Sequence, residues 1–341
     1  MHISDFSYDL PESKIATHPP KVRGSSKLLV LSRKTGQIEH DLYKNFVNYV
    51  QPGDVVVLND TKVIKARLIA RRGEKQREFL LLERHSRQLD THHWKVLYRG
   101  KIKVGETYIV GQTEILVEEV LEGGLACISS TSDLLELSDT SGNVPLPPYI
   151  KRSATQEDIE RYQTEFARVA GSVAAPTASL NFTEELIDKL TAKGVEITYL
   201  TLHVGLGTFL PIRTDDVEDH EMHSEYFEIP ASTTAIIKQA KNNNKRVFAV
   251  GTTVTRTLEY AQEQILKSST SDLTGEADIF IYPGYSFKIV DGLLTNFHAP
   301  KTTVLMLAAA FAGWDNLKEA YDSALKSGYK LLSYGDSMLI T

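Results

Sequence analysis

The sequence has very little cysteine and no long apolar run. Its 341 residues include one cysteine, Cys127, which cannot form an internal disulfide and fits a reducing compartment. Cysteine is among the most buried residue types, so we expect this thiol to be buried. No basic segment followed by an apolar stretch opens the chain, and no apolar run approaches the roughly 20 residues that span a bilayer. We therefore expect a cytoplasmic protein with no membrane partner.

Motifs for nucleotide hydrolysis, zinc binding and serine-hydrolase chemistry are also absent. There is no Walker loop, no cysteine pair and no nucleophile elbow. His220 and His223 lie closer in sequence than the histidine pair of zinc proteases, so we interpret them as part of a surface loop and predict no metal site. Gly205-Leu206-Gly207 lacks the third glycine and the downstream acid of a dinucleotide-binding motif, which argues against NAD.

Positive charge is concentrated in one segment of an otherwise ordinary globular composition. Hydrophobic residues make up 42% of the chain, charged residues 24%, and the formal charge is −6. Between Lys62 and Lys103, however, thirteen basic residues face four acidic ones, which gives this segment +9 and leaves −15 elsewhere. Such a segment either steers a polyphosphate ligand to one end of the molecule or is simply a solvated face of basic strands.

Residues 67–146 read as a series of short strands. Glycines separate short apolar runs, and helical periodicity is nearly absent. Short strands at regular spacing with turn residues between them are typical of an all-β barrel or sandwich. The predicted strands follow the apolar runs at 79–82, 94–97, 108–110, 115–117 and 125–128.

Helices and strands alternate after the connector Pro145-Leu146-Pro147-Pro148. Thr183 is a good helix N-cap, and Gly194 stands where the residue after a helix C-cap belongs. The further predicted elements are a strand at 195–204, a strand at 246–250 that leads through a tight turn into an amphipathic helix, a strand at 278–282 and a helix at 302–312.

A buried strand also precedes the β-rich segment. Val55 to Leu58 are all apolar and follow a Pro-Gly turn. If this strand belongs with the C-terminal elements, the β-rich segment is an insertion. We therefore predict a discontinuous α/β domain over residues 1–66 and 147–341, with an all-β domain inserted over residues 67–146.

The junction Gly251-Thr252-Thr253 is a candidate anion site. A helix N-terminus exposes backbone N–H groups, which suit a carboxylate or a phosphate. One turn further on, Arg256 and Glu259 lie on nearby faces and offer partners for a carboxylate and an amine. Alternatively, Thr252 only caps the helix, and Arg256 and Glu259 form an i,i+3 ion pair. The local sequence leaves both interpretations open.

Histidines and aromatic residues mark the ends of other predicted elements. His203 stands at a strand end beside Gly205, where it is either available for proton transfer or a satisfied core histidine. Tyr282 and Tyr285 flank a Pro-Gly turn, and their rings either stack on a purine or an RNA base or close the core. The remaining candidates are Asn296, His298 and Asp336, and for Asp336 the alternative is a role in a turn alone.

Eight long motifs occur in one order along the whole chain. They are DFSYDLPESKIATHP (Asp5–Pro19), PGDVVVLNDTKVIKARL (Pro52–Leu68), PLPPYIKR (Pro145–Arg152), RYQTEFA (Arg161–Ala167), GSVAAPTASLNFT (Gly171–Thr183), TLHVGLGTF (Thr201–Phe209), IFIYPGYSFKIVDGLLTNFHAPKTTVLML (Ile279–Leu307) and YGDSMLI (Tyr334–Ile340). Together they resemble the S-adenosylmethionine:tRNA ribosyltransferase-isomerase family of queuosine biosynthesis. The chain departs from the family pattern at four positions. Ser179 replaces an expected glycine, Asn181 an expected histidine, Val254 an expected serine and Thr255 an expected valine.

The resemblance implies a specific reaction. The ribosyl group of S-adenosylmethionine is transferred to 7-aminomethyl-7-deazaguanine at the tRNA wobble position and isomerised, which gives epoxyqueuosine-tRNA, adenine and methionine. The sulfonium makes the adjacent 5′ carbon acidic, so a general base starts the sequence, and protonation helps to expel adenine. S-adenosylmethionine is then a consumed substrate, and no metal or redox cofactor is implied. The implied fold is an α/β domain of barrel-like character with an inserted β-barrel.

We assign candidate roles within this reaction. The basic barrel is expected to grip the anticodon arm of tRNA, and the α/β domain to hold the sulfonium donor, in a monomer or weak homodimer. A conventional methyltransferase and an RNA-binding module without chemistry are the alternatives. The predicted residues are His203 and His298 as base or acid; Arg256 and Glu259 for the methionine moiety; Thr252, Thr253, Tyr282, Tyr285, Asn296 and Asp336 for substrate binding; and Arg71, Arg72 and Lys75 for tRNA.

Overall fold

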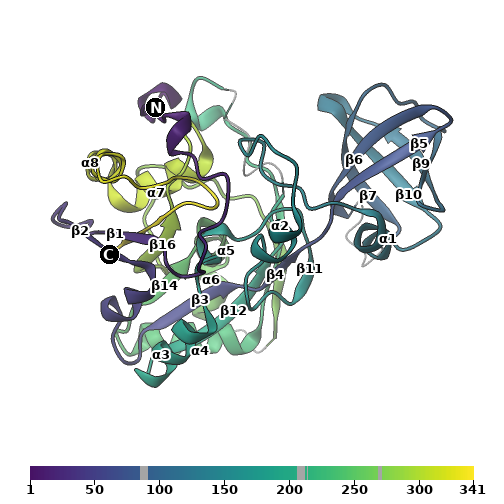
Figure 1. The fold of residues 1–341 in the computed structure, drawn as a ribbon. Helices are drawn as coiled ribbons and strands as arrows, with labels where there is room; N and C mark the ends of the chain where they lie inside the picture. The colour runs from purple at the N-terminus through teal and green to yellow at the C-terminus, as the bar shows by residue number, and fades with distance from the viewer. Residues whose placement is uncertain (85–90, 206–211, 213, 268–270) are drawn as a thin grey trace.

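A mixed sheet of nine strands forms the larger part of the molecule (Figure 1). The computed structural model describes residues 1–84, 91–205, 212, 214–267 and 271–341. Across the sheet the strands are β15 (Leu273–Ala277), β13 (Glu225–Ile229), β12 (Glu196–Leu202), β3 (Val55–Asn59), β14 (Val247–Val250), β16 (Gly292–Asn296), β17 (Ser337–Ile340), β1 (Lys27–Leu31) and β2 (Ile38–Leu42). The central strands β12, β3, β14 and β16 are parallel, so their carboxyl ends meet at one edge. Strands β13 and β17 run antiparallel to their neighbours β12 and β16.

Strand β3 shows how the sequence specifies the centre of this sheet. All five of its residues are buried. Val55 and Val57 belong to one hydrophobic cluster, Val56 and Leu58 to another, because successive side chains of a strand point to opposite faces. A strand that is apolar on both faces is typical of a parallel sheet covered on both sides. The buried strand predicted at 55–58 is therefore confirmed.

Helices cover both faces of the sheet. Thr183 accepts a hydrogen bond from the N–H of Leu186 at 3.2 Å, and Gly194 follows the C-cap residue with φ +82°, so both predicted helix ends are confirmed. Among the described residues, no helix has the length and apolar character needed to cross a membrane. The helices are α1 (Leu134–Ser141), α2 (Gln156–Arg161), α3 (Glu184–Ala192), α4 (Ala231–Asn242), α5 (Thr252–Tyr260), α6 (Gln262–Lys267), α7 (Thr303–Ala312) and α8 (Trp314–Lys326).

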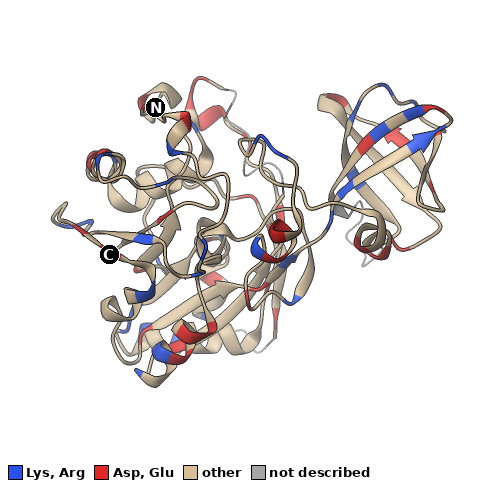
Figure 2. Ribbon diagram, in the orientation of Figure 1, with Lys and Arg blue, Asp and Glu red and all other residues tan. Residues whose placement is uncertain are grey.

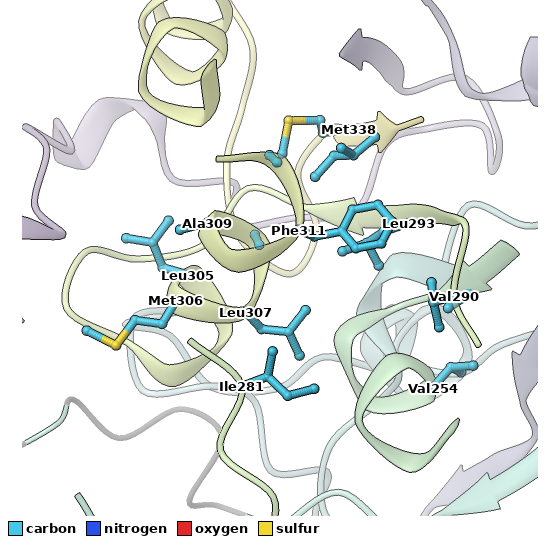
Figure 3. Packing of buried hydrophobic residues seen from close by; sticks show 14 of the residues in the cluster. Val254, Ile281, Val290, Leu293, Leu305, Met306, Leu307, Ala309, Phe311 and Met338 are labelled. Atoms are coloured by element: carbon cyan, nitrogen blue, oxygen red, sulfur yellow. The ribbon is translucent and has the colours of Figure 1, made fainter. Parts of the chain in front are cut away.

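Helices α5 and α7 pack against the sheet, and both begin at one edge of it. Leu305 and Phe311 of α7 lie in one cluster with Val254 of α5 and Leu293 of β16 (Figure 3). Nearly every residue of α7 is buried, as expected for a helix that is apolar on all sides. Because α5 follows β14 directly and α7 follows β16, both helices start at the carboxyl edge of the parallel strands.

One predicted strand lies elsewhere. We expected a strand at 278–282, but β15 ends at Ala277. Its partner β13 begins at Glu225, which pairs with Ala277 in the last step of the ladder. Beyond that pair no strand hydrogen bonds support residues 278–282, and an apolar run alone is not sufficient for a strand.

Six further strands close into an antiparallel barrel in the order β10-β7-β6-β5-β8-β9, which confirms the predicted β-barrel. Cys127 is buried in it, as expected. Helix α1 was not predicted; it begins after Asp133, whose carboxylate accepts the N–H groups of Leu135 and Glu136, and its Leu134 packs on the barrel core. The strands are β5 (Arg67–Arg72), β6 (Lys75–Arg84), β7 (His93–Arg99), β8 (Thr107–Val110), β9 (Thr113–Val120) and β10 (Leu125–Ser130).

The barrel is attached where two short strands pair. Strand β4 (Thr61–Val63), just before the barrel, is parallel to β11 (Val169–Ser172), after it, and Arg67 bridges to Asn143. The barrel therefore projects from the larger part at one place (Figure 1). The α/β class with an inserted barrel is confirmed. We expected the larger part to be barrel-like. Over the described residues its sheet is instead mixed and open, with β15 and β2 as its two edge strands.

Candidate active site

A cavity of about 90 Å³ lies at the carboxyl edge of the parallel strands. Its wall is assembled from residues that follow β11, β12, β14 and β16, together with the start of α7 and the segment before β17. Ligands of open α/β sheets bind at this edge. Four predicted residues line the cavity, namely Thr252, Thr253, Asn296 and His298, together with others that were not predicted, including Tyr149, Thr177, Thr302 and Ser333.

Backbone groups, not charged side chains, set the polarity of this cavity. None of the described residues that line it is Asp, Glu, Lys or Arg. The N–H groups of residues 252–254 precede the first intrahelical bond of α5, which runs from Thr255 to Gly251, and they have no acceptor among the described residues. The start of α7 borders the same cavity through Thr302 and Val304. Two helix N-termini therefore direct partial positive charge into one uncharged space.

His298 is held at the cavity wall by three hydrogen bonds. Its Nε2 pairs with the Thr295 hydroxyl at 2.9 Å. Its carbonyl accepts from the Tyr8 hydroxyl at 2.6 Å, and its N–H donates to the Tyr321 hydroxyl at 2.8 Å. Burial lowers the pKa of His298 to about 3, so the imidazole is neutral at physiological pH. Its Nδ1 has no hydrogen-bond partner within the described part of the chain and is available to a ligand.

Asn296 anchors a polar network in the same wall. Its amide oxygen accepts from the Thr177 hydroxyl at 2.9 Å, and its amide nitrogen donates to the Leu332 carbonyl at 3.3 Å. Leu332 has φ +71°, a backbone conformation that is rare for a residue with a branched side chain and that clusters at functional sites. Next to it, the Ser333 hydroxyl hydrogen-bonds to the Tyr149 hydroxyl. The wall is thus rigidly positioned by groups from distant parts of the sequence.

His203 lies outside this cavity. Its neighbour Val204 lines the cavity, and successive side chains of extended backbone point to opposite sides. The His203 Nδ1 pairs with the Thr61 hydroxyl at 2.8 Å, and its ring stacks on Tyr226 with centroids 6.0 Å apart. A Cβ at Gly171 would lie 2.7 Å from Nε2, so only glycine leaves room for this imidazole. The structure therefore separates the two predicted catalytic histidines.

Arg256 and Glu259 bind groups of the protein itself. Arg256 is 4% exposed, and its guanidinium donates to the Glu225 carboxylate at 2.6 Å and to the Ala277 carbonyl at 3.0 Å. Glu259 is fully buried and accepts the backbone N–H groups of residues 288–290 at 2.9–3.0 Å. Neither residue lines the cavity, and they do not pair with each other. These partners exclude the alternative i,i+3 ion pair between Arg256 and Glu259, because buried charges require fixed partners. The expected contact with the methionine moiety stays a prediction.

Three other predicted substrate residues also lie away from the cavity. Tyr282 and Tyr285 pack against the core of the large domain. The Asp336 carboxylate accepts the N–H groups of Lys27 at 2.7 Å and Lys330 at 2.8 Å, which braces the turn before β17. The alternatives considered for these residues, closing the core and forming a turn, match the positions that they occupy.

The predicted tRNA-binding residues lie together on the barrel. Arg71, Arg72 and Lys75 are exposed at the turn between β5 and β6, and Arg72 pairs with Lys75 across the hairpin. Arg72 also forms an ion pair with Glu106. Basic residues are visible along these two strands in Figure 2. Arg87 of the same basic segment lies outside the described residues.

Two motifs were set aside in the sequence, namely the histidine pair His220 and His223 and the glycines at 205 and 207. His220 packs edge-on against Phe280, with ring centroids 5.2 Å apart. Within the described residues, no group of three or more His, Cys, Asp and Glu side chains is arranged to hold a metal ion. Leu206 and Gly207 of the glycine motif lie outside the described residues.

Comparison with known proteins extends over the whole chain. The family model for "Queuosine biosynthesis protein" matches residues 3–340. The chain belongs to this family. Proteins named S-adenosylmethionine:tRNA ribosyltransferase-isomerase from Pelodictyon phaeoclathratiforme and Chlorobium chlorochromatii are 53% and 54% identical to it, with each pair of chains covered completely. The crystal structure of S-adenosylmethionine tRNA ribosyltransferase from Thermotoga maritima is 35% identical, with a TM-score of 0.57, and covers 99% of this chain and all of its own.

Two of the departures from the family pattern, Asn181 and Val254, lie in different places. Asn181 is 3% exposed and accepts a hydrogen bond from the N–H of Gly24 at 3.3 Å, away from the cavity lining. Val254 is buried in the first turn of α5, where its side chain packs in the hydrophobic core. The backbone N–H groups at the start of α5 therefore still face the cavity, although the side chain of Val254 is apolar.

Proposed function

We propose that this member of the family transfers the ribosyl group of S-adenosylmethionine to 7-aminomethyl-7-deazaguanine in tRNA and isomerises it, giving epoxyqueuosine-tRNA with release of adenine and methionine. The observation that carries this proposal is the full-length similarity, at 53% identity, to proteins named for that reaction. The cavity supports it with the chemistry that it offers. Its described lining has no charged side chain, it receives two helix N-termini, and it includes the neutral imidazole of His298.

In this proposal the donor occupies the cavity with its ribose near His298. The 5′ carbon beside the sulfonium is acidic, and Nδ1 of His298, which has no partner among the described residues, accepts its proton. Burial keeps the imidazole neutral at physiological pH, which is the form that can accept a proton. Asn296 and Thr177 line the same wall and offer hydrogen bonds to ribose hydroxyls or adenine. His203 stays a candidate acid or base on the other side of the strand.

The inserted barrel is the proposed contact for the anticodon arm. Its exposed cations, Arg71, Arg72 and Lys75, suit phosphates of a folded RNA, whose backbone supplies most of the affinity. The alternative, a solvated face without a ligand, predicts no effect of these residues on RNA binding. The donor is consumed in this scheme, and the scheme needs no resident cofactor. We further propose cytoplasmic action as a monomer or weak homodimer.

Product analysis tests the reaction. The protein is incubated with S-adenosylmethionine labelled in the ribose and with an anticodon stem-loop that carries 7-aminomethyl-7-deazaguanine. We expect label in the RNA together with adenine and methionine in equal amounts. Formation of S-adenosylhomocysteine would instead indicate methyl transfer, and an unchanged donor with bound RNA would indicate a binding module. Either result would refute the proposal.

A further inference from the structure

The first turn of α5 carries a buried hydroxyl without a partner. Thr253 is 7% exposed, and its Oγ1 has no hydrogen-bond partner within the described part of the chain. This oxygen lies at the start of the helix, since a Cβ built on Gly251 would be 3.6 Å from it. Leaving a buried hydroxyl unpaired is unfavourable. A ligand atom in the cavity that Thr253 lines would supply the missing partner.

The groups around this hydroxyl select an anion. The N–H groups of residues 252–254 have no acceptor among the described residues, and they point out of the positive end of a nine-residue helix. Gly251 has φ +99° and no side chain, so the approach to these N–H groups stays open. No cationic side chain among the described residues lines the cavity. An anion bound here would be recognised by backbone and hydroxyl donors.

We propose that the N-terminus of α5 binds the carboxylate of the amino-acid end of S-adenosylmethionine. This inference rests on the proposed function, and it gives the carboxylate a site that differs from Arg256. The Arg256 guanidinium is held by Glu225 and the Ala277 carbonyl outside the cavity lining, whereas the donors of α5 at the cavity have no partner in the described protein. With the carboxylate held at Thr253, the sulfonium and ribose extend toward His298 and Asn296, which line the same cavity. The carboxylate does not react, so this site orients the donor.

Two ligands and three protein variants test the site. The ligands are S-adenosylmethionine and its decarboxylated analogue, which keeps the sulfonium, the ribose, the adenine and the amine. We expect Thr253→Val to weaken binding of S-adenosylmethionine about tenfold, the loss of one charge-assisted hydrogen bond, and to leave the analogue unaffected. Thr253→Ser keeps the hydroxyl and should bind both ligands as the unmodified protein does.

Thr303→Val is the matched control. Thr303 is also a first-turn threonine with a buried and unpaired hydroxyl, on α7, but it does not line the cavity. We expect this variant to bind both ligands normally. Thermal melting of each variant verifies that the protein is folded at the temperature of the titrations.

The outcomes separate the anion site from the reaction. Equal weakening of both ligands by Thr253→Val would overturn the inference, as would normal binding of S-adenosylmethionine. So would a loss confined to the anticodon stem-loop, because the anion at α5 would then be an RNA phosphate. If the selective loss is found but the unmodified protein transfers no label to RNA, the carboxylate site stands and the proposed function fails.

Discussion

The inserted barrel and the cavity of the large domain differ in how they carry positive charge. The barrel exposes Arg71, Arg72 and Lys75 at a hairpin, where a mobile side chain meets a phosphate in many orientations. The cavity has no charged lining among the described residues, and nearby Arg256 is buried against Glu225. Exposed cations give affinity for a long polyanion, whereas fixed dipoles orient one small ligand. This contrast is why we propose that the barrel binds RNA and that the reaction takes place in the cavity, whose described lining carries no charged side chain.

Replacing the buried arginine should have the largest effect. Arg256→Ala leaves the Glu225 carboxylate buried without its cation, which should lower the free energy of unfolding by about 3–5 kcal/mol. Urea denaturation measures this change. In the folded fraction at low temperature, we expect the dissociation constant of S-adenosylmethionine to be unchanged.

An exposed ion pair supplies the control for Arg256. Lys267 contacts Glu263 at 2.9 Å, but both side chains are about three-quarters exposed, and Lys267→Ala should change stability by less than about 1 kcal/mol. If Arg256→Ala kept normal stability and lost donor binding, the arginine would belong to the substrate site after all, and the contrast between the two regions would fail.

Removing the cavity imidazole should affect turnover and spare RNA binding. We expect His298→Ala to lower kcat by about 100-fold or more, because a positioned base is lost. The dissociation constant of the anticodon stem-loop should remain normal, since the barrel is unchanged. Single-turnover kinetics with labelled donor measure the first quantity, and a filter-binding titration the second. His203→Ala is the comparison variant, and its kcat shows whether the histidine outside the cavity also contributes. Near-normal turnover of His298→Ala would show that the cavity imidazole is not the base of the reaction.

Removing the barrel cations should have the converse effect. We expect the triple variant of Arg71, Arg72 and Lys75 to alanine to weaken stem-loop binding about tenfold or more. The slope of log K against log[salt] should fall by about 0.7–0.9 for each phosphate that the variant no longer neutralises. Turnover at saturating RNA should be normal. A matched triple variant replaces three exposed lysines of the large domain, Lys189, Lys267 and Lys326, and should leave both quantities unchanged. Equal effects of the two triple variants would show that the charge acts nonspecifically.

The sequence predicts the barrel far better than the cavity, for a physical reason. Barrel strands alternate buried and exposed residues within a single segment, as in β8, so a local pattern is sufficient. The cavity joins Tyr149, Thr177, Thr253, His298 and Ser333, which are brought together only by the order of strands in the sheet. Thr252 and Thr253 were found because a strand-to-helix turn has a local signature. Tyr149 and Ser333 have none, although both lie in or next to motifs shared with the family.

Arg256 and Glu259 show what local reasoning leaves open. Their spacing on α5 places both near the start of this helix, but the direction in which a side chain points depends on what packs against the helix. Here β13 supplies Glu225 to the arginine, and the loop before β16 supplies three N–H groups to Glu259. A lone charged residue on a buried face meets a structural partner more often than a ligand, and only the tertiary structure identifies that partner.

The last prediction is a pH dependence of stability that originates in the cavity. His298 has a folded-state pKa of about 3, below the usual 6.5, because burial disfavours the imidazolium. Between these values the unfolded chain binds a proton that the folded protein does not, so His298 makes the free energy of unfolding fall with decreasing pH, by at most about 1.4 kcal/mol per pH unit. Above pH 6.5 the effect vanishes. His298→Gln cannot titrate, and urea denaturation from pH 7 to pH 4 should show a shallower decline for this variant than for the unmodified protein. Parallel declines would mean that the imidazole titrates normally in the folded state. The cavity would then hold a cation at mildly acidic pH, and it would no longer differ from the barrel in carrying no charged side chain.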